Sequence, residues 1–262
     1  MRDALNPPML RTFVAVSLCS LAFAPHAQAL SAKELDSIGR RVWQNECSGT
    51  RDGLTSWNSG ENFASLGIGH FIWYPKGIDG PYEESFPGLV AFLQERGAKL
   101  PAWLKPDSDC PWNSRAEFQA EFRSERMNDL RNLLASTIRE QSQFLARRLE
   151  KALPKMLAEA PAARRDEIRA RFEKLSSSGK GMFAMIDYVN FKGEGTNPKE
   201  RYRGEGWGLL QVIDGMENGA EPVRAFSDSA ARVLAKRVQN AAPKNETQWL
   251  KGWTSRVKSY AN

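Results

Sequence analysis

Apolar residues recur every three or four positions along most of the chain, the spacing that places them on one face of an α-helix. Ser31 and Ser114 each stand three residues before a glutamate, a capping box that marks the start of a helix. We expect 114–160 to form two helices, with Pro154 bending or restarting the second. The full pattern predicts helices over 31–46, 87–96, 114–160, 164–175, 182–189, 206–213, 222–240 and 246–260.

One stretch in the N-terminal third departs from the helical pattern. The segment from Phe63 to Tyr74 has a strand-like composition that Gly67 and Gly69 interrupt, which predicts a small β element. The chain has no internal repeat and no linker long enough to divide it. We therefore expect one mainly α domain over 30–262, of the α+β class, with a small β-hairpin.

The N-terminal residues have the pattern that is typical of an export signal. Residues 10–24 form a short apolar run after Arg2 and Arg11, and Ala27-Gln28-Ala29 follows as a small-x-small cleavage site. This predicts a signal peptide over 1–29, with Met1 or Met9 as the true start, and a periplasmic or secreted protein. Because a membrane span needs about 20 apolar residues, we expect no stable span after cleavage.

Composition and net charge limit what kind of protein this is and what kind of molecule it binds. With 41% apolar and 26% charged residues, the chain is neither disordered nor a polytopic membrane protein. Cleavage leaves 233 of the 262 residues and removes two arginines and one aspartate, so the net charge falls from +6 to +5. This modest charge is spread along the helices. It favours an anionic polymer such as a cell-wall glycan over nucleic acid as the partner.

Cysteine and histidine counts exclude more chemistry than the charge does. The mature chain keeps only Cys47, Cys110 and His70, which cannot assemble a Cys/His zinc site, so we expect no metal. No phosphate-binding or dinucleotide fingerprint is present, and no cofactor is expected. In an exported chain two cysteines predict a Cys47–Cys110 disulfide, with two buried free thiols as the alternative.

Glu46 is the first candidate for catalysis. It lies in the last turn of the first predicted helix, where the negative end of the helix dipole disfavours a carboxylate. Such a place favours the protonated form that a general acid needs, especially where water is partly excluded. An exposed glutamate at a frayed helix end is the alternative.

The residues after Glu46 carry a family resemblance. A polar loop leads into residues 57–70, WNSGENFASLGIGH, with an acidic residue, a hydroxyl residue and then Gly-Ile-Gly-His. This order resembles the phage-type lysozymes of the lysozyme-like superfamily over about 25 residues. The resemblance implies that Glu46 is the general acid and that Ser65, at the family's threonine position, orients a water. It also implies a structural role for His70.

The second carboxylate of that family is displaced in this chain. The family's aspartate falls at Ser59 when counted back from the glycines, so Glu61 is the nearest carboxylate and Asp52 the other candidate. Glycoside hydrolysis ordinarily uses two carboxylates, whose separation decides between inversion and retention. Glu61 is the preferred candidate for the second carboxylate. The alternative is that Glu61 is only a turn residue of the hairpin and has no part in catalysis.

Several further residues are candidates for binding a sugar. Trp57, in a polar loop, is the best stacking platform, with Asn58 beside it, whereas Trp73 and Trp207 have apolar neighbours that favour core packing. Near two later glycine-rich turns, polar side chains either line the cleft or satisfy local backbone groups. These are Asn190, Lys192, Glu194 and Gln211.

Three functions remain open from the sequence. The preferred one is an exported, metal-independent peptidoglycan hydrolase in which Glu46 acts as general acid and Glu61 or Asp52 assists. A lytic transglycosylase, which needs only one acid/base carboxylate, is the second. A non-catalytic periplasmic glycan-binding protein on the same scaffold is the third.

Overall fold

The computed structural model describes residues 30–78, 80 and 82–262, and the predicted signal peptide over 1–29 lies outside these residues. The first elements are α1 (Ala32–Cys47), the 3₁₀ turn η1 (Asp52–Leu54), β1 (Thr55–Ser56), β2 (Ala64–Leu66), β3 (Phe71–Trp73), α2 (Phe86–Glu95), α3 (Arg115–Ala120) and α4 (Glu125–Ser136). The others are α5 (Ile138–Glu159), η2 (Ala162–Arg164), α6 (Arg165–Ser176), α7 (Gly179–Lys192), β4 (Arg201–Tyr202), β5 (Glu205–Gly206), α8 (Leu209–Asp214), α9 (Pro222–Asn240), α10 (Thr247–Lys258) and η3 (Ser259–Ala261).

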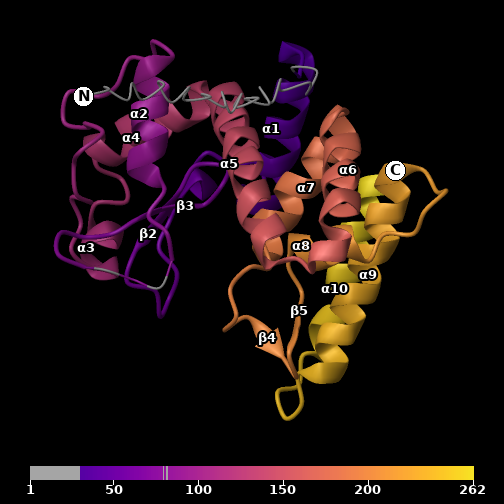
Figure 1. Cartoon of the computed structure of the whole chain (residues 1–262). Helices are drawn as coiled ribbons and strands as arrows, with labels where there is room; N and C mark the ends of the chain where they lie inside the picture. Colours follow the sequence, from indigo (N-terminus) through magenta and orange to yellow (C-terminus); the bar gives the residue numbers. More distant parts are fainter. Residues whose placement is uncertain (1–29, 79, 81) are drawn as a thin grey trace, which may run out of the picture.

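The 22-residue helix α5 stands between two groups of elements. The small sheet lies with α2, α3 and α4 on one side of it, and α6 to α10 lie on the other (Figure 1). Helix α1 packs against α5, against α7 of the second group and against η1, which directly precedes the small sheet. The predicted mainly α fold with a small β-hairpin is confirmed.

Helix α1 begins where the sequence predicts. The side chain of Ser31 accepts a hydrogen bond from the backbone N–H of Glu34, whose carboxylate accepts one from the N–H of Ser31. The helix ends at Cys47, one residue beyond the predicted end, because Ser48 adopts a left-handed backbone conformation. Glu46 is therefore in the last turn of the helix.

The small sheet has the order β1-β2-β3, and both strand pairs are antiparallel. The turn between β2 and β3 runs from Gly67 to His70, and both of these residues have positive φ. The amide side chain of Gln141 on α5 fixes this turn by accepting a hydrogen bond of 3.0 Å from the N–H of Ile68. The predicted β element is thus a hairpin tied to α5.

The predicted helical region over 114–160 is three helices rather than two. Ser124 caps α4 with its side chain, and Thr137 separates α4 from α5. Pro154 lies inside α5 and does not end it. The sequence pattern also missed the β4–β5 hairpin, because strands of two residues are too short to show an alternating pattern.

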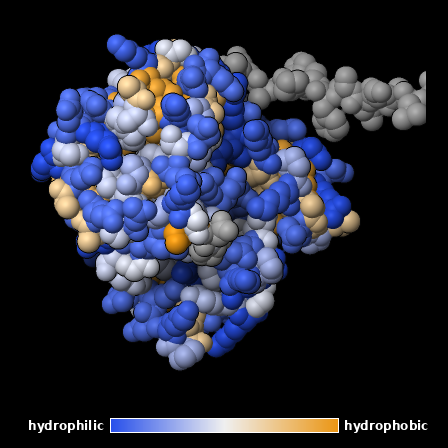
Figure 2. Space-filling model, turned by 90° about the vertical axis from the view of Figure 1, so that its left-hand side faces the viewer, coloured by the Kyte–Doolittle hydropathy of each residue, from blue (hydrophilic) through white to orange (hydrophobic). Residues whose placement is uncertain are grey.

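Buried apolar side chains form one continuous core from Ile38 on α1 to Tyr260 in η3. The face that Figure 2 shows is mostly hydrophilic, and its apolar patches are small and separate. Within the described part of the chain, no helix is both long enough and apolar enough to cross a membrane.

Candidate active site

Glu46 is held between two basic side chains. Its side chain is 12% exposed, and one carboxylate oxygen pairs with a terminal nitrogen of Arg256 on α10. The other oxygen, Oε2, lies 3.8 Å from Nδ1 of His70 in the β2–β3 turn. The three residues come from α1, the hairpin and α10, so the fold brings together positions that are far apart in the sequence.

Arg256 is itself positioned by Asp187, a carboxylate of α7 that is wholly buried. Arg256 donates to both oxygens of Asp187, at 2.8 and 2.9 Å, and the hydroxyl of Tyr260 donates to Oδ2 at 2.6 Å. The side-chain amide of Asn45 donates to Oδ1 at 2.9 Å. Burial alone would lower the pKa of Arg256, but hydrogen bonds and charges from Asp187 and Glu46 outweigh it and raise this pKa.

A cleft of about 510 Å³ opens beside this network. One wall comes from the hairpin side and includes Gly69, His70 and Ile72, with Tyr82 and Glu83 from the following loop. The other wall comes from the end of α7 and the segments after it. It includes residues 189–194, Glu200, Trp207 and Arg237, and Arg148 is added from α5.

Glu46 does not itself line the cleft and reaches it through His70, which is 38% exposed. The carboxylate is therefore largely shielded from water and separated by His70 from a cleft of about 510 Å³. General acid catalysis requires the acid to reach the reacting oxygen within hydrogen-bond distance or through one water, and His70 is the residue between Glu46 and the cleft.

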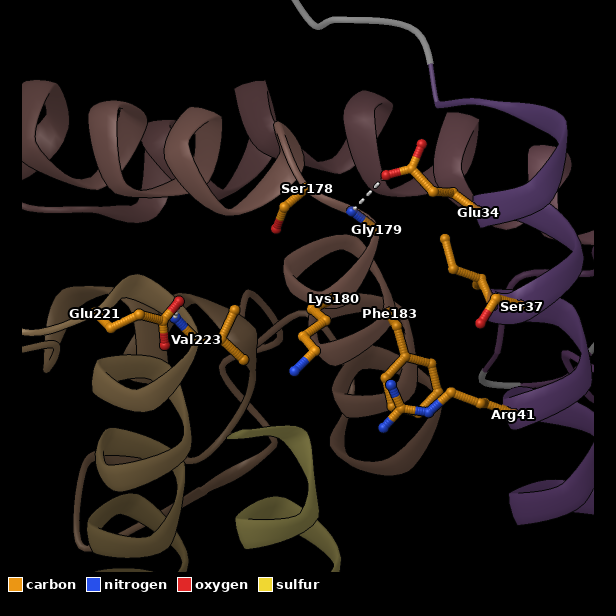
Figure 3. Close-up of a pocket in the computed structure, with 10 residues that line it drawn as sticks. Glu34, Ser37, Arg41, Ser178, Gly179, Lys180, Phe183, Glu221 and Val223 are labelled. Atoms are coloured by element: carbon orange, nitrogen blue, oxygen red, sulfur yellow. Dashed lines mark hydrogen bonds between the residues drawn. The ribbon is translucent and has the colours of Figure 1, made fainter. Parts of the chain in front are cut away.

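A second cavity, of about 450 Å³, lies between α1 and the N-terminal ends of α7 and α9 (Figure 3). Its two carboxylates hold backbone groups: Glu34 accepts from the N–H of Gly179 at 3.2 Å, and Glu221 caps α9. Arg41 lies over the ring of Phe183, 3.7 Å from its centroid. Because these groups already have structural partners, we place the chemistry in the cleft beside Glu46.

No family model matches this chain, and no curated protein and no solved structure matches it either. Any functional conclusion therefore depends on the site alone.

The two candidates for the second carboxylate are both outside the residues that line the cleft. Glu61 accepts a hydrogen bond of 3.1 Å from the side-chain amide of Asn58. Asp52 pairs with Arg123 at 2.9 Å and with the buried Arg131 at 3.5 Å. Each carboxylate thus has a local partner on the hairpin side of the molecule.

Ser65 lies in the middle of β2, opposite Ile72 of β3, and is 5% exposed. It is not among the residues that line the cleft. Gln211 is also away from the cleft, because its side chain accepts from the N–H of Gly208 at 2.9 Å and donates to the carbonyl of Gly195 at 3.0 Å. Of the two roles predicted for Gln211, its side chain therefore has the structural one, in which it satisfies local backbone groups.

Trp57 is not the exposed sugar platform that its polar loop suggests. It is 4% exposed, its indole N–H donates to the carbonyl of Glu61 at 2.9 Å, and its ring packs edge-on against Phe118. The loop is polar, but it folds over the ring. Trp207, expected in the core, is 8% exposed and lines the cleft with Tyr202 against it, their centroids 4.5 Å apart.

Asn190 and Lys192, at the end of α7, both line the cleft. The side-chain nitrogen of Asn190 is buried and has no hydrogen-bond partner among the described residues. The ammonium of Lys192 lies over the rings of Phe191 and Trp253, at 4.0 and 3.5 Å from their centroids. Burial, followed by the charge of Arg237, lowers the pKa of Lys192 to about 7.

The predicted Cys47–Cys110 disulfide is not formed. Both cysteines are free and buried, and the thiol of Cys47 contacts the carbonyl of Gly67 at 3.7 Å. Cys110 pairs instead with Pro75 through a backbone bridge. Burial raises the pKa of each thiol to about 12. Among the described residues no group of three His, Cys, Asp or Glu side chains is arranged to hold a metal ion.

Sequence reasoning missed Arg256, Asp187 and Tyr260, which make up most of the network around Glu46. One signal was available for Asp187: it is the charged residue in a short apolar run, 182–189, that must be buried. A buried carboxylate needs a cationic or hydrogen-bonding partner, although the sequence does not say which residue supplies it.

Proposed function

We propose that this protein is an exported glycoside hydrolase that acts on peptidoglycan, with Glu46 as its general acid. The observation that carries the proposal is the position of Glu46, which is 12% exposed and held by Arg256 behind His70 of the cleft. In glycoside hydrolysis a carboxylic acid protonates the oxygen of the leaving group. A shielded carboxyl beside a groove is suited to that step.

The surrounding residues position the acid and balance its charge. Arg256 stabilises the carboxylate that remains once Glu46 has given its proton to the glycosidic oxygen. Asp187 fixes the guanidinium through two hydrogen bonds and so sets the direction from which Arg256 approaches Glu46. His70 forms the boundary between Glu46 and the cleft.

A lytic transglycosylase is the second candidate, and one observation favours it. Glu61 and Asp52 hold other partners and lie outside the residues that line the cleft. A transglycosylase needs one acid/base carboxylate, because the sugar's own hydroxyl replaces water as the nucleophile. Its products carry 1,6-anhydro ends, whereas hydrolysis leaves reducing ends.

The test uses purified mature protein on insoluble peptidoglycan, with release of soluble sugars as the measurement. Glu46→Gln should lower the rate by a factor of at least about 100, since a positioned acid contributes this much or more. Glu61→Gln is assayed beside it as the test of the second carboxylate, and circular dichroism checks that both variants fold.

The products decide between the candidates. Reducing ends, together with a loss of rate in Glu61→Gln, support the two-carboxylate hydrolase. Anhydro ends with full activity of Glu61→Gln support the transglycosylase. Wild-type protein that binds peptidoglycan but releases no sugar would overturn both and leave a glycan-binding protein.

A further inference from the structure

Three side chains on one wall of the cleft have hydrogen-bond donors without an oxygen partner. Arg148 of α5 makes no hydrogen bond, ion pair or ring contact with any described residue. Asn190 of α7 has a buried, unpaired side-chain nitrogen. Lys192 contacts aromatic rings and has no carboxylate within 4.0 Å among the described residues.

The charges around Lys192 do not supply the missing partner. Arg237 and Arg256 both act against the ammonium, and Glu246 acts in its favour. Glu246 is already bound to Arg237 through two hydrogen bonds, and Arg256 is held by Asp187. A partly buried ammonium without a counter-anion is unfavourable, whereas a ligand that brings an anion would relieve this cost.

The other charged side chains of the cleft have surroundings of their own, although Glu194 also lines a small cavity together with Arg148 and Asn190. Glu194 pairs with Lys155 at 3.2 Å, and His70 faces Glu46. Glu83 is exposed on the loop of the opposite wall, and Glu200 lies near Gly193. The charges that chiefly act on Lys192 are those of Arg237, Glu246 and Arg256, and none of these four side chains forms an ion pair with it. The donors of the α5 and α7 wall are therefore free to bind an anion from outside the protein.

We propose that Arg148, Asn190 and Lys192 form a subsite for a carboxylate carried by the glycan. This subsite rests on the proposed function, since the cleft beside Glu46 must hold the substrate. A carboxylate accepts up to four hydrogen bonds, which fits a guanidinium, an amide and an ammonium on one wall. The protein would then select acidic glycans over neutral ones of the same length.

Peptidoglycan offers two sources of such a carboxylate, the lactyl group of its muramic acid and the attached peptide. The experiment measures equilibrium binding to Glu46→Gln protein, which removes turnover. Three probes separate the sources: neutral chitotetraose, the peptide-free tetrasaccharide of alternating N-acetylglucosamine and N-acetylmuramic acid, and the free stem tetrapeptide. The same probes are then titrated against a version that also carries Lys192→Met.

We expect the muramic tetrasaccharide to bind at least about 10-fold more tightly than chitotetraose, and Lys192→Met to remove most of that difference. Arg147→Gln is the control, because Arg147 is an exposed cation on α5 that lies over Phe92 and does not line the cleft. If the free peptide instead binds with the same dependence on Lys192, the carboxylate comes from the peptide and the subsite stands.

Two outcomes would overturn the subsite. One is equal binding of the muramic tetrasaccharide, the peptide and chitotetraose to the Glu46→Gln protein. The other is a preference for acidic probes that Lys192→Met leaves intact. Either result leaves the proposed function standing if the wild type releases sugars from peptidoglycan. Conversely, a carboxylate preference without any turnover would support the subsite and contradict the enzyme.

Discussion

At the scale of single residues, the most constrained group is Asp187. It is wholly buried, and three residues donate hydrogen bonds to it. A buried carboxylate that lost its cationic partner, or a buried guanidinium that lost its carboxylate, would be left without compensation. Asp187 therefore supports both the stability of the C-terminal helices and the position of Arg256 beside Glu46.

We predict that Asp187→Asn lowers the free energy of unfolding by about 3–5 kcal/mol, the usual effect of removing one partner from a buried ion pair. Urea denaturation at neutral pH measures it. Asp36→Asn is the control, because Asp36 makes a similar two-point pair with Arg139 but on the surface. If both variants lost the same small amount of stability, the buried pair of Asp187 and Arg256 would stabilise the fold no more than an exposed ion pair does.

The two cysteines allow a second prediction at this scale. Burial raises the pKa of both thiols to about 12, so neither is a thiolate near neutral pH. We expect a protein of residues 30–262, native at pH 8, to react hardly at all with a thiol reagent. The same unreduced protein in denaturant should show two reactive thiols, Cys47 and Cys110. Zero thiols in denaturant would instead reveal a disulfide.

At the scale of elements, the β2–β3 turn places His70 beside Glu46, and its geometry depends on Gly67. This residue has φ +68°, and a Cβ there would lie 2.5 Å from the side-chain oxygen of Gln141. That oxygen accepts the hydrogen bond from Ile68 that ties the turn to α5. A side chain at this position would therefore force the turn away from α5.

We predict that Gly67→Ala destabilises the protein by more than the roughly 1–2 kcal/mol that a left-handed conformation costs a residue with a Cβ. Gly77→Ala is the matched control, since Gly77 has φ +72° but open space around its Cα. The difference between the two variants in urea denaturation isolates the contact with Gln141. Equal losses of stability in the two variants would mean that the β2–β3 turn can shift away from Gln141 at no cost.

Short-range signals explain which elements the sequence could predict. Capping residues and apolar spacing located α1 to within one residue, and two glycines located the hairpin. The region 114–160 was predicted as two helices instead of three, and the break at Thr137 was missed because the apolar spacing continues across it. The β4–β5 hairpin was missed because each of its strands has only two residues. Strands this short show no alternating pattern in the sequence, and their pairing is seen only in the folded structure.

At the scale of the whole molecule, the site is built from contacts between distant parts of the chain. Glu46 and Arg256 are 210 residues apart, and Asp187 and Arg256 are 69 apart. The sequence could predict Glu46, because the end of a capped helix and the following motif are local features. It could not predict Arg256, because nothing within α10 distinguishes this arginine from its neighbours until the helices pack.

Packing also changes how the stability of the molecule depends on pH, and Lys192 shows this most directly. Burial and Arg237 lower its pKa from 10.5 to about 7, while the faces of Phe191 and Trp253 attract its ammonium. Between pH 7 and about 10.5 the unfolded chain therefore binds a proton that the folded protein does not. The contribution of Lys192 to the free energy of unfolding must therefore increase with pH between pH 7 and about 10.5.

We predict that the wild type gains stability relative to Lys192→Met as the pH increases from 7 to 10. Urea denaturation of both proteins at pH 6.5, 8 and 9.5 gives the difference. The cysteines act in the opposite direction, because their raised pKa favours folding below pH 9 and this contribution is lost as the pH approaches 12. They are common to both proteins, so their effect cancels. If the stability of the two proteins changed in parallel with pH, Lys192 would have to stay charged across this range. In that case its contacts with the aromatic rings would outweigh its burial, and Lys192 would already be protonated when an anionic ligand binds.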